Sequence, residues 1–485
     1  MSKIQLSYIV LIAGLLLLLF SCRRDDYYEG NDVNLRFSVD TLRFDTVFTK
    51  VGSATRIIKI YNPVDLPVRV NLTMDTESQR FFRFNVEGVK GPVANNIEIN
   101  ANDSIYVFVE VTINPDDPLI ASPFIIEGKI LVEVNGNTKN LYLEAFGQNA
   151  NYITGTNKGA VSLLSCQFGQ VAWDDPKPYV VYGILYIDSC QLNLPAGTRV
   201  YVHGGIVRDE STLYNDGLIV CLQNGRIVSK GTVEQPVIIQ GDRLEPAYAD
   251  VKSQWVGVLF APGSRGNMME HTTIKNSIIG IQVDSLARVD LNSCRFYNTG
   301  NAGIIGRHGF ISADNCLIYN NDGPAVLLRH GGSYQFQYCT VASYGGRSEA
   351  VSMTNYTCYE FPCEQAFVNP LDALFVNCIF AGSNEDEVSI DYVGERSDLF
   401  YKFENCIVRV NQLLRSGDHT DFFDHCTDCH NLKLGERLFL NQPKQDYRLD
   451  TMSVALGKAR PIFITKDIDG KDRKTTNPDP GCFEF

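Results

Sequence analysis

The sequence has few methionines and tryptophans, and outside one short stretch it has no long apolar run. Only 6 of its 485 residues are Met and 2 are Trp. Methionine is a common axial ligand of c-type haem, so its scarcity argues against a haem protein. The longest apolar run, residues 9–20, is shorter than the roughly 20 residues that a membrane-spanning helix needs. No other segment could cross a membrane as a helix.

Positive charge is also scarce. The chain has 43 Lys and Arg against 56 Asp and Glu, which gives a net charge of -13. Proteins that bind nucleic acid usually carry an excess of Lys and Arg for the phosphate backbone. The acidic balance therefore argues against nucleic acid as a partner. With 44% hydrophobic and 20% charged residues, the composition is that of an ordinary globular protein.

Residues 1–22 have the layout of a bacterial export signal. A short start that contains Lys3 precedes the apolar run, which ends in Leu19-Phe20-Ser21-Cys22. This ending resembles a lipobox, and the resemblance implies cleavage before Cys22 and lipidation of that cysteine. Several acyl chains hold a protein to a membrane far more firmly than one chain does. A plain signal peptide or a short membrane anchor is the alternative.

The residues after Cys22 bear on the location of the protein. Arg23-Arg24-Asp25-Asp26 resembles the surface-export signal of Bacteroidota-type lipoproteins, which implies an outer-membrane lipoprotein exposed at the cell surface. The inner leaflet of the outer membrane is the alternative location. We therefore expect a signal peptide at 1–21, a tether at 22–32 and contact with the membrane through the lipid on Cys22. Export also permits disulfides among the other cysteines.

Residues 33–150 have the pattern of a β-sandwich. Stretches such as IYVFVEVTIN alternate apolar and polar residues, and Asn, Gly, Pro and Asp separate them. About seven such stretches in this length are typical of two packed sheets. The order KIYNPVDLPVRV, FNVEGV, NDSIYVFVEV and LYLEAFG resembles the immunoglobulin-like domains of the abnormal-spindle and Hydin type. Such domains serve as spacers or binding modules, and this region shows no catalytic constellation.

Residues 151–485 carry an internal repeat. Asn276, Asn298 and Asn320 are 22 residues apart, and similar words recur, such as SCRFYN, NCLIYN and NCIFAG. A repeat of roughly 20–25 residues with alternating apolar positions and many Asn and Gly predicts a parallel β-helix. Equivalent residues of successive coils then stack about 4.8 Å apart. The stacked asparagines are expected to bond to the backbones of neighbouring coils.

The repeat places most cysteines in the core. We expect each small apolar Cys side chain to point inward, together with the residue two positions further on. These residues are Cys294, Cys316, Cys339, Cys378 and Cys406, with Phe296, Ile318, Val341, Phe380 and Val408. Cys358 and Cys363 lie in an inserted loop, where either a local disulfide or two free thiols would be compatible with export.

Three places carry a resemblance to right-handed parallel β-helix proteins of the pectate-lyase-like class. They are the repeats, the stretch SQWVGVLFAPGS at 253–264, and the ending DIDGKDRKTTNPDPGCFEF, which resembles the usual terminator of such proteins. With its N-terminal features, the chain resembles uncharacterised surface lipoproteins of Bacteroidota. The predicted fold is all-β, with an N-terminal Ig-like β-sandwich followed by a right-handed parallel β-helix at 151–485. Trp255 is expected in the core, and stacking on a sugar is the alternative.

The stretch HCTDCH at 425–430 contains the C-x-x-C-H pattern of haem attachment and four soft metal ligands. Haem would need a helical support, and no helical pattern is near. Zinc held by His425, Cys426, Cys429 and His430 is the better metal hypothesis, but adjacent residues of a strand point to opposite faces. The favoured interpretation makes Cys426 the next inward cysteine after Cys406. Cys429 then lies in the following turn, with or without a disulfide to Cys426.

Two RHG words form the clearest ladder of charged residues. Arg307-His308 and Arg329-His330 are 22 residues apart, and Asp284 falls at the equivalent place one coil earlier. Two arginines about 5 Å apart repel by roughly 1 kcal/mol in water, so their stacking does not by itself require a ligand. Arginine suits carboxylates, which makes all five residues candidates for binding a glycan, uronates above all. The alternatives are exposed side chains without a ligand, or a lyase that uses Arg or His as its base.

Other candidates for chemistry are weaker. Asp174-Asp175 is the only adjacent aspartate pair in the second domain, so the aspartate words of polygalacturonase-type hydrolases are missing. Asp467, Asp469 and Asp472 have a spacing that could hold calcium, but a terminator turn is favoured. No metal, cofactor or catalytic residue is predicted. The favoured function is a membrane-anchored surface protein that binds a glycan. A polysaccharide lyase acting on uronate-containing glycans and a purely structural protein are the alternatives.

Overall fold

The computed structural model describes residues 26–44, 55–113, 124–147, 149–155, 161–208, 213–244, 246–358, 360, 362–415 and 419–485. The chain forms two compact units, which divide between Gln148 and Asn149. The expected signal peptide and the lipidation residue Cys22 lie outside the described residues. The described helices are short 3-10 turns, and none is long and apolar enough to cross a membrane. They are η1 (Ser78–Arg80), η2 (Pro246–Tyr248), η3 (Arg396–Asp398), η4 (Phe422–His425) and η5 (Gln442–Lys444).

The first unit is a sandwich of two five-stranded sheets. One has the order β1 (Arg36–Phe37), β3 (Arg56–Tyr61), β8 (Ser104–Val111), β5 (Phe82–Val86) and β6 (Val89–Lys90). The other has the order β2 (Thr41–Phe44), β10 (Asn137–Phe146), β9 (Ile125–Val134), β4 (Val68–Met74) and β7 (Val93–Ile99). Alternate residues point inward, as Val68, Val70 and Leu72 do, and form one core. The predicted sandwich is confirmed, with more strands than the pattern suggested.

Asn62 explains why the sandwich carries the word NPVDLP. Its side chain is buried, and its amide group donates to carbonyl oxygens in the turn that follows β3 and at the end of β7. The acceptors are Leu66 at 2.9 Å, Ile99 at 3.2 Å and Asn100 at 3.0 Å, and Oδ1 accepts the backbone amide of Val64 at 3.0 Å. One side chain therefore ties this turn to the end of β7.

Replacing Asn62 with alanine should destabilise the first unit by about 2–4 kcal/mol, because buried backbone groups would lose their partners. Hydrogen exchange of the amides of β4 and β7 would report the loss as faster opening. The exposed Asn140 of β10 provides a control, and Asn140→Ala should stay within about 0.5 kcal/mol of the wild type. Equal exchange rates in the two variants would show that Asn62 has no such role.

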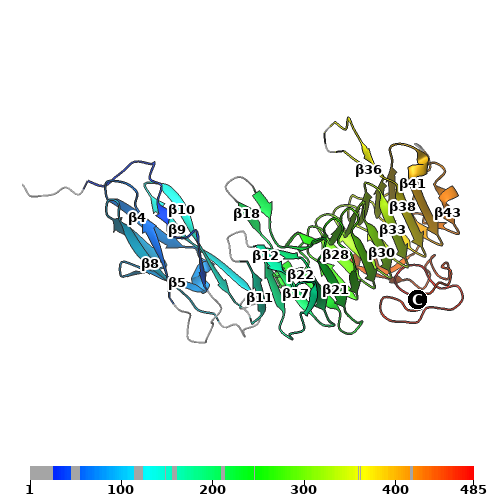
Figure 1. Ribbon diagram of the computed structural model, residues 1–485, viewed down its shortest axis with the longest axis horizontal. Helices are drawn as coiled ribbons and strands as arrows, with labels where there is room; N and C mark the ends of the chain where they lie inside the picture. The colour runs from blue at the N-terminus through cyan, green and yellow to red at the C-terminus, as the bar shows by residue number, and fades with distance from the viewer. Residues whose placement is uncertain are drawn as a thin grey trace, which may run out of the picture. The chain divides into compact units, whose positions relative to one another are not determined.

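The second unit is a parallel β-helix of three sheets, whose stacked strands run from green to orange in Figure 1. The eleven-stranded sheet consists of β11 (Asn151–Thr154), β14 (Tyr179–Tyr182), β17 (Arg199–His203), β22 (Val237–Gly241), β25 (Thr272–Lys275), β28 (Arg295–Thr299), β31 (Leu317–Asn321), β34 (Thr340–Ser343), β39 (Ile379–Gly382), β42 (Ile407–Val408) and β44 (His430–Asn431). The nine-stranded sheet consists of β12 (Val161–Leu164), β15 (Ile184–Ile187), β20 (Leu218–Cys221), β23 (Gly257–Phe260), β26 (Ile281–Val283), β29 (Ile304–Arg307), β32 (Val326–Arg329), β35 (Val351–Thr354) and β40 (Val388–Asp391).

The ten-stranded sheet completes each coil. It consists of β13 (Gly169–Ala172), β16 (Cys190–Leu194), β21 (Arg226–Lys230), β24 (Asn267–Glu270), β27 (Arg288–Asn292), β30 (Phe310–Asp314), β33 (Gly332–Gln337), β38 (Leu371–Val376), β41 (Leu399–Glu404) and β43 (Cys426–Thr427). The described residues also form three short antiparallel pairs: β18 (Ile206–Arg208) with β19 (Leu213–Asn215), β36 (Tyr356–Thr357) with β37 (Phe367–Val368), and β45 (Phe439–Asn441) with β46 (Asp446–Leu449).

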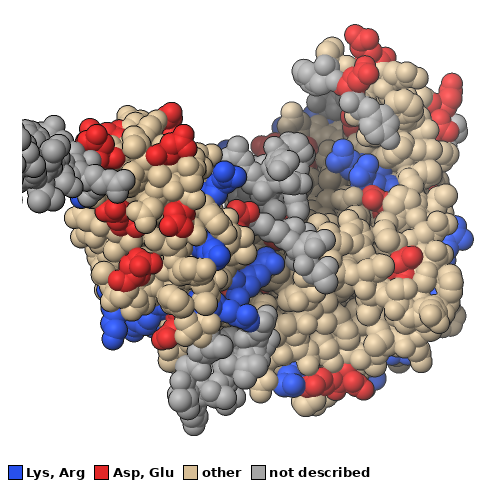
Figure 2. All heavy atoms as spheres, turned by 60° about the vertical axis from the view of Figure 1, so that its left-hand side comes forward, with Lys and Arg blue, Asp and Glu red and all other residues tan. Residues whose placement is uncertain are grey.

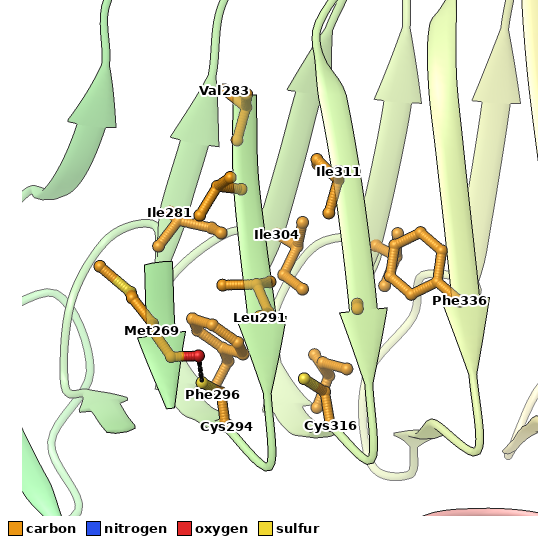
Figure 3. Packing of buried hydrophobic residues seen from close by; sticks show 14 of the residues in the cluster. Met269, Ile281, Val283, Leu291, Cys294, Phe296, Ile304, Ile311, Cys316 and Phe336 are labelled. Atoms are coloured by element: carbon orange, nitrogen blue, oxygen red, sulfur yellow. Dashed lines mark hydrogen bonds between the residues drawn. The ribbon is translucent and has the colours of Figure 1, made fainter. Parts of the chain in front are cut away.

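Equivalent residues of successive coils stack in the core. The five predicted inward cysteines are fully buried, and so are the five residues two positions after them. The thiol of Cys294 donates to the carbonyl oxygen of Met269 in the coil before, at 3.3 Å (Figure 3). The residue before each of these cysteines has a left-handed φ, as Ser293 and Asn315 do, so the chain turns sharply into the eleven-stranded sheet. Trp255 is buried too, as expected.

The cysteine ladder continues through Cys429, and the prediction that Cys426 continues it was wrong. Cys426 pairs in register with Phe403, and His430 pairs with Ile407, so Cys429 is the residue that stacks on Cys406. The Cys429 thiol donates to the carbonyl oxygen of Phe403 in the coil before, as the thiols of four earlier cysteines do, those of Cys294, Cys339, Cys378 and Cys406. The preceding residue again has a left-handed φ. Because the coil has 23 residues rather than 20, counting from Cys406 led to the wrong cysteine.

The described residues form two disulfides. Cys358–Cys363 lies in the hairpin of β36 and β37, which is one of the two states left open by the sequence. Cys166–Cys190 joins the first two coils and was not among the predictions. The other described cysteines, Cys426 and Cys429 among them, are free thiols.

Asn276, Asn298 and Asn320 stack at the turn that leaves the eleven-stranded sheet, each with a left-handed φ. The bonds differ from those expected. Asn320 donates to Oδ1 of Asn298 at 2.5 Å. Asn276 donates to the carbonyl oxygens of Ala249 and Val251 at 2.9 and 3.0 Å. The ladder therefore bonds partly within itself and partly to the inserted loop before β23, because that loop covers its N-terminal end.

Asp314 lies in the same row of the ten-stranded sheet as Asn292 and Gln337. Burial, together with the nearby Cys339 and Asp290, raises the pKa of its carboxyl to about 7. The folded state then keeps a proton that the unfolded chain releases near pH 4. This contribution to stability is present below about pH 4 and is lost as the pH rises through 7.

Asp314→Asn should therefore raise the stability of the second unit at pH 8 by about 1–2 kcal/mol and leave it almost unchanged at pH 4, a range discounted for the partial exposure of the carboxyl. Urea unfolding at both pH values would measure the difference. Asp322→Asn, at an exposed carboxylate that pairs with Lys252, is the control and should change little. A pH-independent effect of Asp314→Asn would contradict the assignment.

The final segment, residues 466–485, is the predicted terminator turn. The carboxylate of Asp467 accepts the backbone amides of Asp469 and Lys471 at 3.0 and 2.8 Å, and that of Glu484 at 3.0 Å. The side chain of Asp469 pairs with Arg295 at 2.6 Å. That of Asp472 instead pairs with a lysine on the other side of the turn. The three carboxylates that could have formed a calcium site thus each have separate partners.

Arg473 fastens this segment to the coils. Its buried guanidinium lies 3.7 Å from the ring centroid of Tyr338. It donates to Oδ1 of Asn315 at 2.7 Å and to the carbonyl oxygen of Gly481 at 3.0 Å. It also pairs with the equally buried carboxylate of Glu484 at 3.4 Å. The D-x-x-G-x-x-R and G-x-F-E words of the terminator are therefore held together by one buried cation.

Candidate functional site

The five candidate residues lie at one corner of the coils, where the chain passes from the nine-stranded to the ten-stranded sheet. Arg307 and Arg329 are the last residues of β29 and β32, and they pair in register. Val283 pairs with Gly306, which places Asp284 opposite Arg307 in the preceding coil. The predicted stacking of the two RHG words and of Asp284 is therefore present. We call this set the basic corner: Asp284, Arg307, His308, Arg329 and His330.

The local backbone explains the word RHG. His308 and His330 have φ of 56° and 63°, the left-handed region in which the chain makes its turn. The glycine after each histidine has no room for a side chain. A Cβ on Gly309 would lie 2.8 Å from Val283, and one on Gly331 would lie 2.4 Å from a backbone oxygen. The turn therefore presents the two imidazoles side by side, with ring centroids 5.7 Å apart.

The charges of the basic corner are only partly neutralised. Arg307 lies 3.6 Å from the carboxylate of Asp284, which also accepts a hydrogen bond from Gln282 at 2.9 Å. Within the described ranges, Arg329 has no carboxylate at ion-pair distance. On the face drawn in Figure 2, basic and acidic side chains lie in small separate groups. The surface shown thus offers local sites for charged ligands rather than one broad basic field.

His330 is held in its neutral form by its surroundings. Burial lowers the pKa of its imidazole, and the nearby His308, Arg307 and Arg329 lower it further. Near pH 7 this ring can therefore accept or donate a hydrogen bond without adding charge. His308 has a partner of its own, because its Nδ1 lies 3.4 Å from the hydroxyl of Ser285.

The row continues beyond Arg329 towards the C-terminus. Thr354 follows Met353, the partner of Leu328, and pairs in register with Asp391. The hydroxyl of Tyr356 donates to Asp391 at 2.5 Å, and this bond raises the pKa of the tyrosine. Neither Tyr356 nor Asp391 was among the sequence candidates, because both lie outside the 22-residue repeat. The basic corner therefore ends at Asp391, a carboxylate that already accepts a hydrogen bond from Tyr356.

The side chains of HCTDCH do not converge. The His425 ring lies against Tyr401, with centroids 4.3 Å apart, while His430 pairs with Glu436 at 3.0 Å. Cys429 packs in the core, and the described residues contain no group of three or more metal-ligating side chains. His425, His430 and Cys429 therefore each contact different neighbours rather than one common point.

Comparison with known proteins supports the fold of part of the second unit. Residues 181–341 match the family model of the right handed beta helix region. No curated protein matches the chain. The ASH / PapD-like domain of human CEP192 is 10% identical over 27% of this chain and 94% of that domain, with a TM-score of 0.18. The catalytic unit of the GH87 alpha-1,3-glucanase from Streptomyces thermodiastaticus strain HF3-3 is 8% identical over 73% of this chain and 74% of that one, with a TM-score of 0.26. The chain is an all-β protein in which an immunoglobulin-like β-sandwich precedes a right-handed parallel β-helix.

Proposed function

We propose that this protein is a membrane-anchored cell-surface protein that binds an acidic glycan at the basic corner. The observation that carries the proposal is the in-register pair of Arg307 and Arg329, of which Arg329 has no carboxylate partner among the described residues. Although the net charge of the chain is -13, the positive charge of Arg329 lies beside that of Arg307 without a carboxylate partner among the described residues. A bound anion would remove that repulsion.

The geometry of the corner suits a carboxylate on a sugar. The planar guanidinium of arginine binds carboxylates through two parallel hydrogen bonds, which gives direction as well as charge. Successive coils are about 4.8 Å apart, which is close to the length of one sugar unit in an extended polysaccharide. The neutral ring of His330 and the hydroxyl of Ser285 can bond to sugar hydroxyls. A uronate-containing polysaccharide lying along the row would match both the charge and the spacing.

The membrane anchor is the other part of the proposal. The export signal with its lipidation residue Cys22 would hold the chain at the outer membrane, and the acidic stretch after it supports exposure at the cell surface. The sandwich would then serve as a spacer that carries the β-helix away from the membrane.

Binding to uronate polysaccharides tests the proposal directly. The full chain should bind immobilised polygalacturonate or alginate, and Arg329→Gln should weaken binding at least tenfold, because the unpaired cation would be lost. Raising the salt concentration should weaken binding by the wild type. The control is Arg437→Gln, at an exposed arginine 3.9 Å from Asp450, which should bind like the wild type. Unchanged binding by Arg329→Gln would refute the proposal.

A lyase is the second candidate, favoured by the neutral His330 beside two arginines. A base would remove the C5 proton of a uronate, and the electron pair would expel the sugar linked at C4, leaving an unsaturated product that absorbs ultraviolet light. We expect a flat absorbance trace with galacturonate, guluronate and glucuronate polymers in the presence of calcium. A rising trace that vanishes in Arg307→Ala would instead establish catalysis.

A further inference from the structure

A pocket lies on the same corner of the coils, closer to the N-terminus than the basic corner. It is lined by Phe168, Gln223, Asn224, Arg226, Gly263, Arg265 and Leu286. Arg226 is the first residue of β21, and the other lining residues belong to four separate turns, which follow β12, β20, β23 and β26 of the nine-stranded sheet. Each turn leads into the ten-stranded sheet, as the turns of the basic corner do. We call this set the N-terminal pocket.

The turns are built to leave the pocket open. Gly263 has a φ of 78°, and a Cβ there would lie 3.3 Å from the side chain of Gln223. Gly266, with a φ of 75°, leaves similar room for the stem of Arg226. The Arg226 guanidinium is held in place by a hydrogen bond to Oε1 of Gln191 at 2.7 Å. Gly263 thus lines the pocket without filling it, and the longer polar side chains provide the rest of its polar lining.

The walls combine three chemical features that a sugar acid needs. Phe168 is 74% exposed, which leaves most of a large apolar ring in contact with water. Its face can cover the C–H face of a sugar ring, and the amides of Gln223 and Asn224 can bond to hydroxyls. Arg226 and Arg265 supply cations for a carboxylate, and within the described part of the chain neither has an ion-pair partner.

The N-terminal pocket and the basic corner share one turn. Leu286 lines the pocket, and its backbone amide donates to the carbonyl oxygen of His308 at 2.9 Å. The residue before it, Ser285, contacts the His308 ring, and its carbonyl oxygen accepts the amide of Gly263 at 2.9 Å. The two sites are therefore neighbours on one row of turns. From β20 to β32 the row spans four steps between coils, or about 19 Å.

We propose that the N-terminal pocket is a second subsite for the same acidic polysaccharide, so that the row binds an extended segment of several uronate units. This inference rests on the proposed function of the basic corner and adds the direction and length of the bound chain. Cations occur at both ends of the row, in Arg226 and Arg265 and in Arg307 and Arg329. A single sugar acid could reach only one of these ends, whereas a segment along the solenoid axis reaches both.

Calorimetric titration of the full chain with galacturonate and guluronate oligomers of increasing length tests this inference. Wild-type affinity should rise steeply once an oligomer is long enough to contact both sites. Arg265→Gln should weaken binding of the longest oligomer at least tenfold, and Phe168→Ala should do the same through loss of the ring. Arg329→Gln should also weaken binding of this oligomer. The affinity of the double variant Arg265→Gln/Arg329→Gln should fall by less than the product of the two single losses, because in each single variant the oligomer is already held at only one site. Arg437→Gln is the matched control.

The outcomes separate the two proposals. If Arg329→Gln weakens binding and Arg265→Gln does not, the basic corner binds glycan alone and the extended site is refuted. If only Arg265→Gln weakens binding, the proposed function of the basic corner fails and the extended site fails with it. Affinity that does not depend on oligomer length would also refute the inference. Because Arg265 and Phe168 are exposed, their replacement should leave the thermal unfolding of the variants unchanged, which can be checked separately.

Discussion

Replacing Arg473 with alanine should destabilise the β-helix unit by about 3–5 kcal/mol, because it would leave the carboxylate of Glu484 buried without its cation. Both side chains are almost completely buried, at 2% and 1% exposure. The loss would also remove the donor to Asn315 and the cation that lies over Tyr338. The final segment would no longer be fastened to the coils beneath it.

Urea unfolding followed by near-ultraviolet circular dichroism would measure this effect. The control is Lys466→Ala, since Lys466 pairs with Asp472 at the surface of the same turn. Exposed pairs contribute about 1 kcal/mol or less, so this variant should remain close to the wild type. A similar loss in both variants would mean that burial of the ion pair is not what matters.

Replacing Phe375 with alanine should cost about 3–5 kcal/mol through the cavity that it opens. Phe375 is the middle ring of a row of three fully buried rings from successive coils. Its centroid lies 5.5 Å from that of Phe336 and 4.6 Å from that of Phe403. Phe380 meets it edge-on at 5.1 Å. Because contacts in a solenoid are between nearest neighbours, the loss would weaken the coils on both sides.

The same unfolding measurement would test this prediction with two further variants. Phe375→Leu keeps most of the volume and should cost clearly less than the alanine variant. Phe310→Ala, at a ring that is 38% exposed in β30, should cost about 1 kcal/mol or less. If Phe310→Ala were as damaging as Phe375→Ala, the interior stack would not be the main source of stability in this region.

The repeat in the sequence was enough to predict the β-helix because stacking imposes the same inward positions on every coil. Cys294, Cys316 and Cys339 repeat at nearly constant spacing, since no insertions interrupt those coils. The same constancy predicted that Arg307 and Arg329 stack. Where a coil is lengthened, spacing misleads. The left-handed residue before each cysteine would have identified Cys429 in place of Cys426, because the sharp turn rather than the residue count fixes the inward position.

The earlier coils could not be predicted in the same detail. Their turns differ in length, so Phe168, Arg226 and Arg265 lie in no recognisable repeat and meet only in the folded chain. The Cys166–Cys190 disulfide was missed for the same reason. The partners of Asn276 in the loop before β23 depend on an insertion whose path the local sequence does not specify. A site assembled from several irregular turns therefore cannot be predicted from the periodicity of the sequence.

The way in which the last residues fasten the coils bears on the order of events during biosynthesis. The carbonyl oxygens of Arg460 and Lys466 accept bonds from Asn377 and Asn315, and Arg473 bonds to Asn315 in turn. A ribosome makes these asparagines long before it makes the residues that they bind. The C-terminal coils thus lack these bonds until residues 460–473 have been made. Folding of this block of coils can therefore be completed only after a segment made about 80 or more residues later has docked on it.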